Sequence, residues 1–225
     1  MFDALLDFIF PPHCPACDAY VERSGEWCDD CLAAATRPHR IALDEGARQY
    51  IDAAYALGLY RESPLRSLII ELKYNGRRDR LAYIKTFIDG ALRKSLADGT
   101  SMSDIITKCD VAVPVPLHRS KEKKRGFNQT ELIFKGALIG MGLSWSLAIE
   151  RVSETVPQHG LDVEARRRNL DGAFAVADTS SIVDACVLLV DDIFTTGTTA
   201  TSCAHVLMKA GAQSVTVMTL ASDHG

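Results

Sequence analysis

The hydrophobic and polar positions of this chain alternate between strand-like runs and helix-like spacings from residue 50 onward. Apolar runs typical of strands occur at 51–60, 111–116, 144–149, 173–176, 187–190 and 214–220. Apolar residues at helical spacing, with helix-opening or helix-ending residues beside them, occur at 63–72, 80–96, 128–141, 164–170 and 198–210. Alternating strands and helices predict an α/β fold with a mostly parallel, doubly wound sheet.

A second pattern precedes this region. Apolar side chains recur at Phe2, Leu5, Leu6 and Ile9, which predicts a short helix that ends at the prolines of positions 11 and 12. Residues 37–50 are polar and predict no element. We therefore expect two units: a small N-terminal module over 1–40 and an α/β domain over 50–225.

Four of the seven cysteines lie in the N-terminal module, in two CxxC pairs separated by ten residues. They are Cys14, Cys17, Cys28 and Cys31. Each pair can fold into a tight knuckle, and two knuckles complete a tetrahedral shell of four thiolates around zinc. A redox dithiol and a pair of disulfides are the alternatives, but two pairs in series without an export signal favour zinc. Four thiolates leave no open position, so the zinc is expected to be structural.

Composition and charge narrow the class of protein only modestly. With 225 residues and 47% apolar content, the chain can bury the core of one domain beside a small module. The net charge of −4 gives no global argument for nucleic acid, so any such argument rests on local patches. The first ten residues contain no basic residue, and the uncharged run over 136–149 is shorter than the roughly 20 residues of a membrane span. We expect a cytoplasmic protein without a membrane span.

The segment 187–199, VLLVDDIFTTGTT, carries the clearest candidate chemistry. Asp191 and Asp192 follow an apolar run, at the strand end where open α/β sheets bind ligands. The turn after them consists of Thr195, Thr196, Gly197, Thr198 and Thr199. Its hydroxyls and backbone N–H groups, at the start of a helix, favour an anion. A phosphate beside a vicinal diol fits this order of groups; the alternative is a solvated strand end or helix cap.

A stiff turn follows the strand predicted over 111–116. Two prolines remove competing N–H donors there and leave the amides of Leu117 and His118, with Arg119, to face a diphosphate. Without its context, a strand end broken by proline is simply a turn. Lys73, in the motif LKYNG, is a further candidate for a phosphate contact; the alternative is a surface lysine at a helix end.

The run 119–125 has five positive charges against one negative charge. Its candidate nucleic-acid contacts are Lys121, Lys123, Lys124 and Arg125, and Phe127 adds a face on which a base can stack. Single-stranded nucleic acid fits this combination, and such binding would weaken with salt because phosphate contacts release counterions. A solvated loop remains the alternative.

The segment 187–199 resembles the phosphoribosyl-pyrophosphate (PRPP) signature of type I phosphoribosyltransferases at every position. The resemblance implies that Asp191 and Asp192 hold the ribose hydroxyls, that residues 195–199 cradle the 5′-phosphate, and that Mg²⁺ accompanies PRPP. It also implies that 117–119 form a pyrophosphate loop. Residues 151–169 would be a mobile loop that closes over PRPP, with Arg151, Gln158 and Arg166 as its candidate contacts.

The order of motifs along the whole chain resembles the ComF family of phosphoribosyltransferase-like competence proteins. The motifs are the two CxxC pairs, LKYNG at 72–76, PVP at 114–116, RGFNQ at 125–129, TVPQ at 155–158, RRRNL at 166–170 and the PRPP signature. Trp27 departs from the smaller apolar residue usual before the third cysteine. The resemblance implies a role in DNA uptake during natural transformation, with single-stranded DNA contact and a helicase partner.

Three functions remain open at this point. The first is a transferase that acts from PRPP on an unknown acceptor, by positioning and charge stabilisation, since no dedicated base or nucleophile is evident. The second is an accessory protein of DNA uptake that binds PRPP and nucleic acid. The third is a zinc-stabilised adaptor with a vestigial pocket.

Overall fold

A computed structural model describes residues 11–61, 63–94, 99–153 and 172–223. The helix expected over 2–9 and the helix expected over 164–170 lie outside the described residues. So do Gln158 and Arg166, the later candidates of the expected mobile loop.

The sheet confirms the predicted α/β class. Its six strands lie in the order β1-β2-β8-β7-β3-β4, and every neighbouring pair is parallel except the antiparallel pair β1 and β2. Their bounds are Thr36–Arg40 (β1), Ala53–Gly58 (β2), Ser214–Ser222 (β8), Cys186–Phe194 (β7), Val111–Pro114 (β3) and Ser144–Trp145 (β4). A separate antiparallel pair consists of β5, Ile149–Arg151, and β6, Phe174–Val176.

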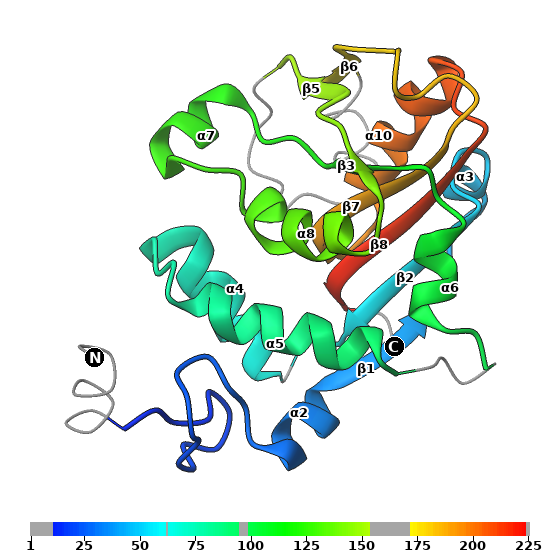
Figure 1. The fold of residues 1–225 in the computed structure, drawn as a ribbon. Helices are drawn as coiled ribbons and strands as arrows, with labels where there is room; N and C mark the ends of the chain where they lie inside the picture. Colours follow the sequence, from blue (N-terminus) through cyan, green and yellow to red (C-terminus); the bar gives the residue numbers. More distant parts are fainter. Residues whose placement is uncertain (1–10, 62, 95–98, 154–171, 224–225) are drawn as a thin grey trace.

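Helices cover both faces of this sheet, so that the strands form the middle of three layers (Figure 1). One face packs against α4, Pro64–Asn75, α5, Arg80–Leu92, and α8, Gln129–Gly140. The other packs against α10, Thr198–Lys209, and α3, Glu45–Arg48. The central strand β7 is buried on both sides: its residues 187–190 are fully inaccessible and alternate between the two cores.

Local sequence explains where the helices of the first face begin and end. Ser63 accepts a hydrogen bond from the Leu65 amide, Pro64 occupies the first turn of α4, and Gly76 ends the helix with a φ of 64°. The Asn128 side chain likewise accepts from the Thr130 amide and begins α8. These starts confirm the helices predicted at 63–72 and 128–141.

Several elements differ from the sequence prediction. Residues 37–50 contain most of β1 and all of α3, although their polar pattern predicts neither. The expected strand over 144–149 is wrong as a single element, because β4 pairs with β3 while β5 begins at Ile149 and pairs with β6. The basic run forms a short helix, α7, Arg119–Arg125, which His118 caps and Gly126 ends with a φ of 81°. A further unexpected helix is α6, Met102–Thr107.

The cysteine-bearing segment packs against α5 from below in the view of Figure 1, with α2, Asp29–Ala35, beside it. Trp27 is 5% exposed; its indole N–H donates to the Tyr83 carbonyl at 2.9 Å, and its ring lies 6.2 Å from that of Phe87. The Thr86 hydroxyl donates to the Gly25 carbonyl at 2.9 Å. These contacts join the N-terminal segment to the core that α4 and α5 share.

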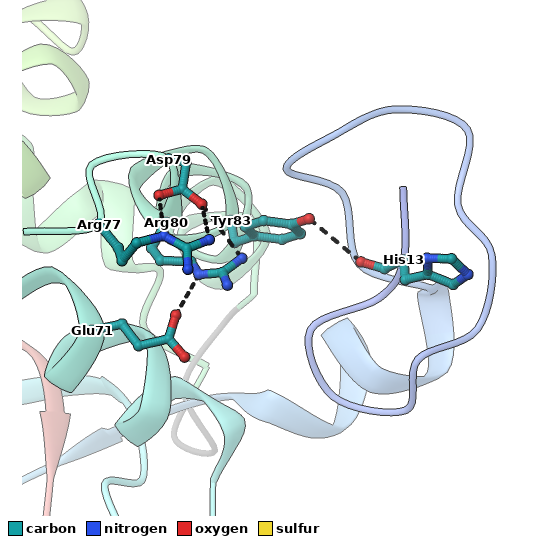
Figure 2. A network of polar contacts seen from close by, with 6 residues as sticks. All are labelled: His13, Glu71, Arg77, Asp79, Arg80 and Tyr83. Atoms are coloured by element: carbon teal, nitrogen blue, oxygen red, sulfur yellow. Dashed lines mark hydrogen bonds and ion pairs between the residues drawn. The ribbon is translucent and has the colours of Figure 1, made fainter. Parts of the chain in front are cut away.

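Polar contacts continue from this junction into the turn between α4 and α5 (Figure 2). The Tyr83 hydroxyl donates to the His13 carbonyl at 3.5 Å, beside the first cysteine. Arg80 forms an ion pair with Glu71 of α4, and Arg77 forms a two-bond pair with Asp79. These two ion pairs stabilise the conformation of the turn between α4 and α5.

Within the described part of the chain, no helix combines the length and the apolar content that crossing a bilayer requires.

Candidate functional site: the end of strand β7

The site lies where β7 extends past its neighbour β3. Pairing between the two strands ends at Pro114 and Val190, whereas pairing between β7 and β8 continues to Phe194 and Ser222. The backbone of Asp191 and Asp192 therefore has a strand on one side only. This is the position at which open parallel sheets leave space for a ligand.

Asp192 is 4% exposed and is held by two side chains from different helices. The Lys73 ammonium of α4 lies 2.8 Å from its Oδ2, and the Gln129 amide of α8 donates to the same oxygen at 2.6 Å. Lys73 is thus buried against a carboxylate, where the sequence proposed a phosphate contact. A buried carboxylate needs such partners because desolvation of an unpaired charge is strongly unfavourable.

Asp191 faces the opposite side of the strand. Alternation places it with Val187 and Leu189, toward α10, and Asp192 with Leu188 and Val190, toward α4 and α8. Burial and the nearby charge of Asp192 raise the pKa of Asp191 to about 8. Burial alone would lower the pKa of Lys73, but the attraction of Asp192 outweighs it and raises that pKa.

The turn after β7 is shaped by one glycine. Gly197 has a φ of 73°, and a Cβ at this position would lie 2.5 Å from the Phe194 ring. The Thr196 and Thr198 hydroxyls lie 2.9 Å apart, and α10 begins at Thr198. A small pocket is lined by Asp191, Ile193, Phe194 and residues 195–200. The structure therefore brings the first carboxylate and the threonine turn of the signature together.

The stiff turn after β3 lies at the same edge of the sheet as the end of β7, because β3 and β7 are neighbouring parallel strands. The Val115 amide donates to the Val190 carbonyl at 2.8 Å, which keeps the chain against β7 up to Val115. Leu117 then precedes His118, whose ring nitrogen accepts from the Ser120 amide. Arg119 is exposed, and its guanidinium lies 2.9 Å from Glu150.

Arg151, the first candidate of the expected mobile loop, lies at the end of β5. Its backbone forms a parallel bridge with that of His118, so it is adjacent to the predicted pyrophosphate loop. Its guanidinium lies over the Phe174 ring at 5.4 Å. Burial lowers the pKa of Arg151, whereas the nearby Cys203 and Asp191 act in the opposite direction. The side chain thus brings positive charge to the side of β7 that Asp191 faces.

The motifs LKYNG and RGFNQ meet around Asp192. Arg125 donates to the Gln129 side-chain oxygen, and its guanidinium lies 5.8 Å from the Tyr74 ring. Arg78 lies 4.7 Å over the Phe127 ring. Phe127 is only 9% exposed, so the prediction that it offers a stacking face does not fit its burial.

Sequence reasoning missed three residues here: Gln129, Tyr74 and Arg78. The first two are part of the motifs that carry the family resemblance, and Arg78 lies just after LKYNG. Their position in or next to these motifs was the available signal, but it did not indicate which of these residues are in contact.

The four cysteines of the N-terminal module form a separate cluster. Their four Sγ atoms all lie within 4.8 Å of one another, and the Sγ atoms of Cys17 and Cys28 are 3.7 Å apart. A tetrahedral zinc with bonds of about 2.3 Å requires sulfurs about 3.8 Å apart. Burial would raise the pKa of Cys14, but hydrogen bonds from backbone N–H groups lower it to about 6. The donor set therefore fits structural zinc, as predicted.

Comparison with known proteins finds similarity over both parts of the chain. A family model described as a double zinc ribbon domain matches residues 5–41. The chain is 30% identical over 209 residues to the DNA utilization protein YhgH of Escherichia coli O157:H7, covering 92% of this chain and 82% of that protein. It is 26% identical to competence protein F of Haemophilus influenzae over 212 residues, 93% and 84% of the two chains.

A third relative is matched over a shorter stretch. The YhgH protein of Salmonella typhimurium is 32% identical over 159 residues, which are 70% of this chain and 66%, just under two thirds, of that protein.

Loss of zinc should loosen Trp27 from α5, because the cysteines on both sides of it would lose their shared ion. The chain has two tryptophans, so the variant Trp145→Phe leaves Trp27 as the only one. We expect a chelator to shift the emission of this variant to longer wavelength, and zinc to restore it. Unchanged emission after metal analysis has shown complete zinc removal would contradict this expectation.

The pair Asp191 and Asp192 predicts a stability that depends on pH. Because the folded state raises the pKa of Asp191 from about 4 to about 8, its contribution to stability is lost as the pH rises through this window. The melting temperature of Asp191→Asn should therefore exceed that of the parent by a margin that grows from pH 5.5 to pH 8 and then levels. Asp192→Asn serves as the contrast: it leaves the buried Lys73 without its counter-charge and should melt lower.

Proposed function

The chain belongs to the competence protein F (ComF) family, and from that premise we propose that it binds PRPP with Mg²⁺ and acts as an accessory factor of DNA uptake that contacts single-stranded DNA. The names of the relatives, DNA utilization protein and competence protein F, support the DNA part of this proposal. The site at the end of β7 supports the PRPP part.

The pocket beside Asp191 is the observation on which PRPP binding rests. Its turn offers the backbone amides that precede α10 and several threonine hydroxyls, which together suit a phosphate dianion. Asp191 reaches the same pocket and can accept hydrogen bonds from a sugar hydroxyl. Asp192, fixed by Lys73 and Gln129, holds the neighbouring backbone in place. A phosphate and a hydroxylated sugar fit this order of groups.

The diphosphate of PRPP would lie toward β3 and β5. The loop 117–119 follows the end of β3, and Arg151 lies beside it through the bridge to His118. A guanidinium and backbone amides there would offset the negative charge of a diphosphate. Mg²⁺ would supply further neutralisation of that group when it accompanies PRPP.

A second candidate function is transfer of the phosphoribosyl group to an acceptor. The half-buried side chain of Arg151 favours it, because departure of pyrophosphate needs positive charge more than it needs a base. A screen of pyrophosphate release from PRPP with bases, nucleosides and single-stranded DNA separates the two candidates. Release with one acceptor would establish a transferase, whereas binding without release under every condition would favour the accessory role.

Calorimetric titration with PRPP and Mg²⁺ tests the pocket directly. We expect one site per chain and, at about pH 9, where Asp191 is ionised despite its raised pKa, at least tenfold weaker binding in Asp191→Asn, because a hydrogen bond to a charged group is replaced by one to a neutral amide. Gly197→Ala should also weaken binding, since its methyl group meets the Phe194 ring. Gly136→Ala, at a helix position with open space, is the matched control. No binding by the parent protein would leave the zinc-stabilised adaptor with a vestigial pocket.

Removal of two basic side chains tests the contact with DNA. Lys123 and Lys124 are exposed on α7, and each phosphate contact contributes about 0.7 to the slope of log affinity against log salt concentration. Lys123→Ala/Lys124→Ala should therefore weaken binding to a single-stranded oligonucleotide and lower this slope by about 1.4. Lys135→Ala/Lys209→Ala removes the same charge from exposed positions on α8 and α10. Equal affinity in both double variants would exclude α7 from the DNA contact.

A further inference from the structure

The end of α4 and the helix α7 form one surface, although more than 40 residues separate them in sequence. Arg125 of α7 lies 5.8 Å from the Tyr74 ring, and Arg78 lies 4.7 Å over Phe127, just after α7. We call this surface the Tyr74 surface, and define it as Tyr74, Arg78, Lys123, Lys124 and Arg125.

The charges in the turn between α4 and α5 are of two kinds. Arg77 and Arg80 are neutralised by Asp79 and Glu71 (Figure 2). Arg78, in contrast, has no carboxylate within ion-pair distance in the described part of the chain. Lys123, Lys124 and Arg125 of α7 likewise have no described carboxylate within ion-pair distance. The Tyr74 surface thus carries four positive charges without a paired carboxylate among the described residues, on a protein of net charge −4, and one of them, Arg125, lies by the Tyr74 ring.

The ring itself is unusual in its exposure. Tyr74 is 74% exposed, whereas Phe127, the aromatic residue of the RGFNQ motif, is buried under Arg78. The paired charges on both sides of Gly76 hold the turn, so the ring projects from an ordered helix end. An exposed tyrosine beside an arginine offers a planar apolar face within a cationic surface.

We propose that Tyr74 is the platform on which a base of single-stranded DNA stacks, while Arg78, Lys123, Lys124 and Arg125 bind the phosphates on either side. The proposal rests on the DNA contact of the proposed function and names the residue that binds the base. Only an unpaired base presents its face to a side chain, so stacking selects single strands over duplex. Any base can stack, so the surface requires no particular sequence.

The Tyr74 surface is also connected to Asp192, whose side chain lies on the face of β7 opposite to that of Asp191. Lys73, which pairs with Asp192, precedes Tyr74 in the chain. Arg125 bonds to Gln129, which donates to the same carboxylate. A DNA strand bound on this surface would therefore lie next to Lys73 and Gln129, the residues that position Asp192.

The test compares two labelled ligands by fluorescence anisotropy. One is an oligothymidine of about 20 nucleotides, and the other is an abasic strand of the same length, which keeps the phosphates and lacks the bases. Tyr74→Ala should bind the oligothymidine about tenfold more weakly and bind the abasic strand as the parent does. Tyr74→Phe should retain parental affinity for both, because it keeps the ring.

Two controls separate this proposal from the function on which it rests. Tyr20→Ala removes another exposed tyrosine, from the N-terminal module, and should leave both affinities unchanged. Lys123→Ala/Lys124→Ala should weaken both ligands equally, because it removes phosphate contacts only. Melting curves of all variants check that each is folded.

The outcomes are distinguishable. Parental affinity of Tyr74→Ala for both ligands, with weakened binding in the lysine variant, would overturn the platform and keep the DNA contact of α7. An equal loss on both ligands would mean that Tyr74 only positions Arg125, and would also overturn the platform. Failure of the parent protein to bind either strand would overturn both proposals.

Discussion

The burial of β7 on both faces is the constraint on which the rest of the structure depends. A strand covered by helices on each side can expose polar groups only where its neighbour ends, and β3 leaves β7 at Val190. The two aspartates follow at once. One core is formed with α4, α5 and α8, and the other with α10. These helices therefore determine how deeply the site is buried and which side chains can contact the aspartates.

The alternation of side chains along the strand gives two adjacent carboxylates different surroundings. Asp192 turns toward α4 and α8, where Lys73 and Gln129 stabilise its charge. Asp191 turns toward α10, and its pKa is raised because burial and the neighbouring carboxylate both disfavour its charge. Ionised Asp191 therefore lowers the stability of the free protein, which is common where a site is arranged for a ligand.

The turn between α4 and α5 connects three parts of the molecule. On one side its charged residues join, through Tyr83, the segment that holds the zinc cysteines. On the other side Lys73 and Tyr74, one residue apart on a helix of 3.6 residues per turn, point in different directions: one is buried against Asp192 and the other is exposed. Loss of the zinc module would therefore remove direct contacts to Tyr83 and Thr86 of α5.

Much of this arrangement could be predicted from local patterns. The apolar runs and helix caps identified β7, α4, α8 and α10, since periodicity and capping act within a few residues. The cysteine spacing likewise identified the four-sulfur cluster, because each knuckle is a local structure. The signature turn was visible for the same reason: Gly197 and the threonines are consecutive.

The remaining features depend on contacts between distant residues, which no local pattern encodes. The pairing of Lys73 with Asp192 joins positions 119 residues apart, and Phe127 is buried in the core shared by α4, α5 and α8, with Arg78 over its ring. Strand β1 exists through its pairing with β2, in a segment whose own residues predict no element. The sequence by itself thus determined which chemical groups the site contains. Tertiary packing decided which residues they contact and how exposed they are, and it made Tyr74, not Phe127, the accessible aromatic ring.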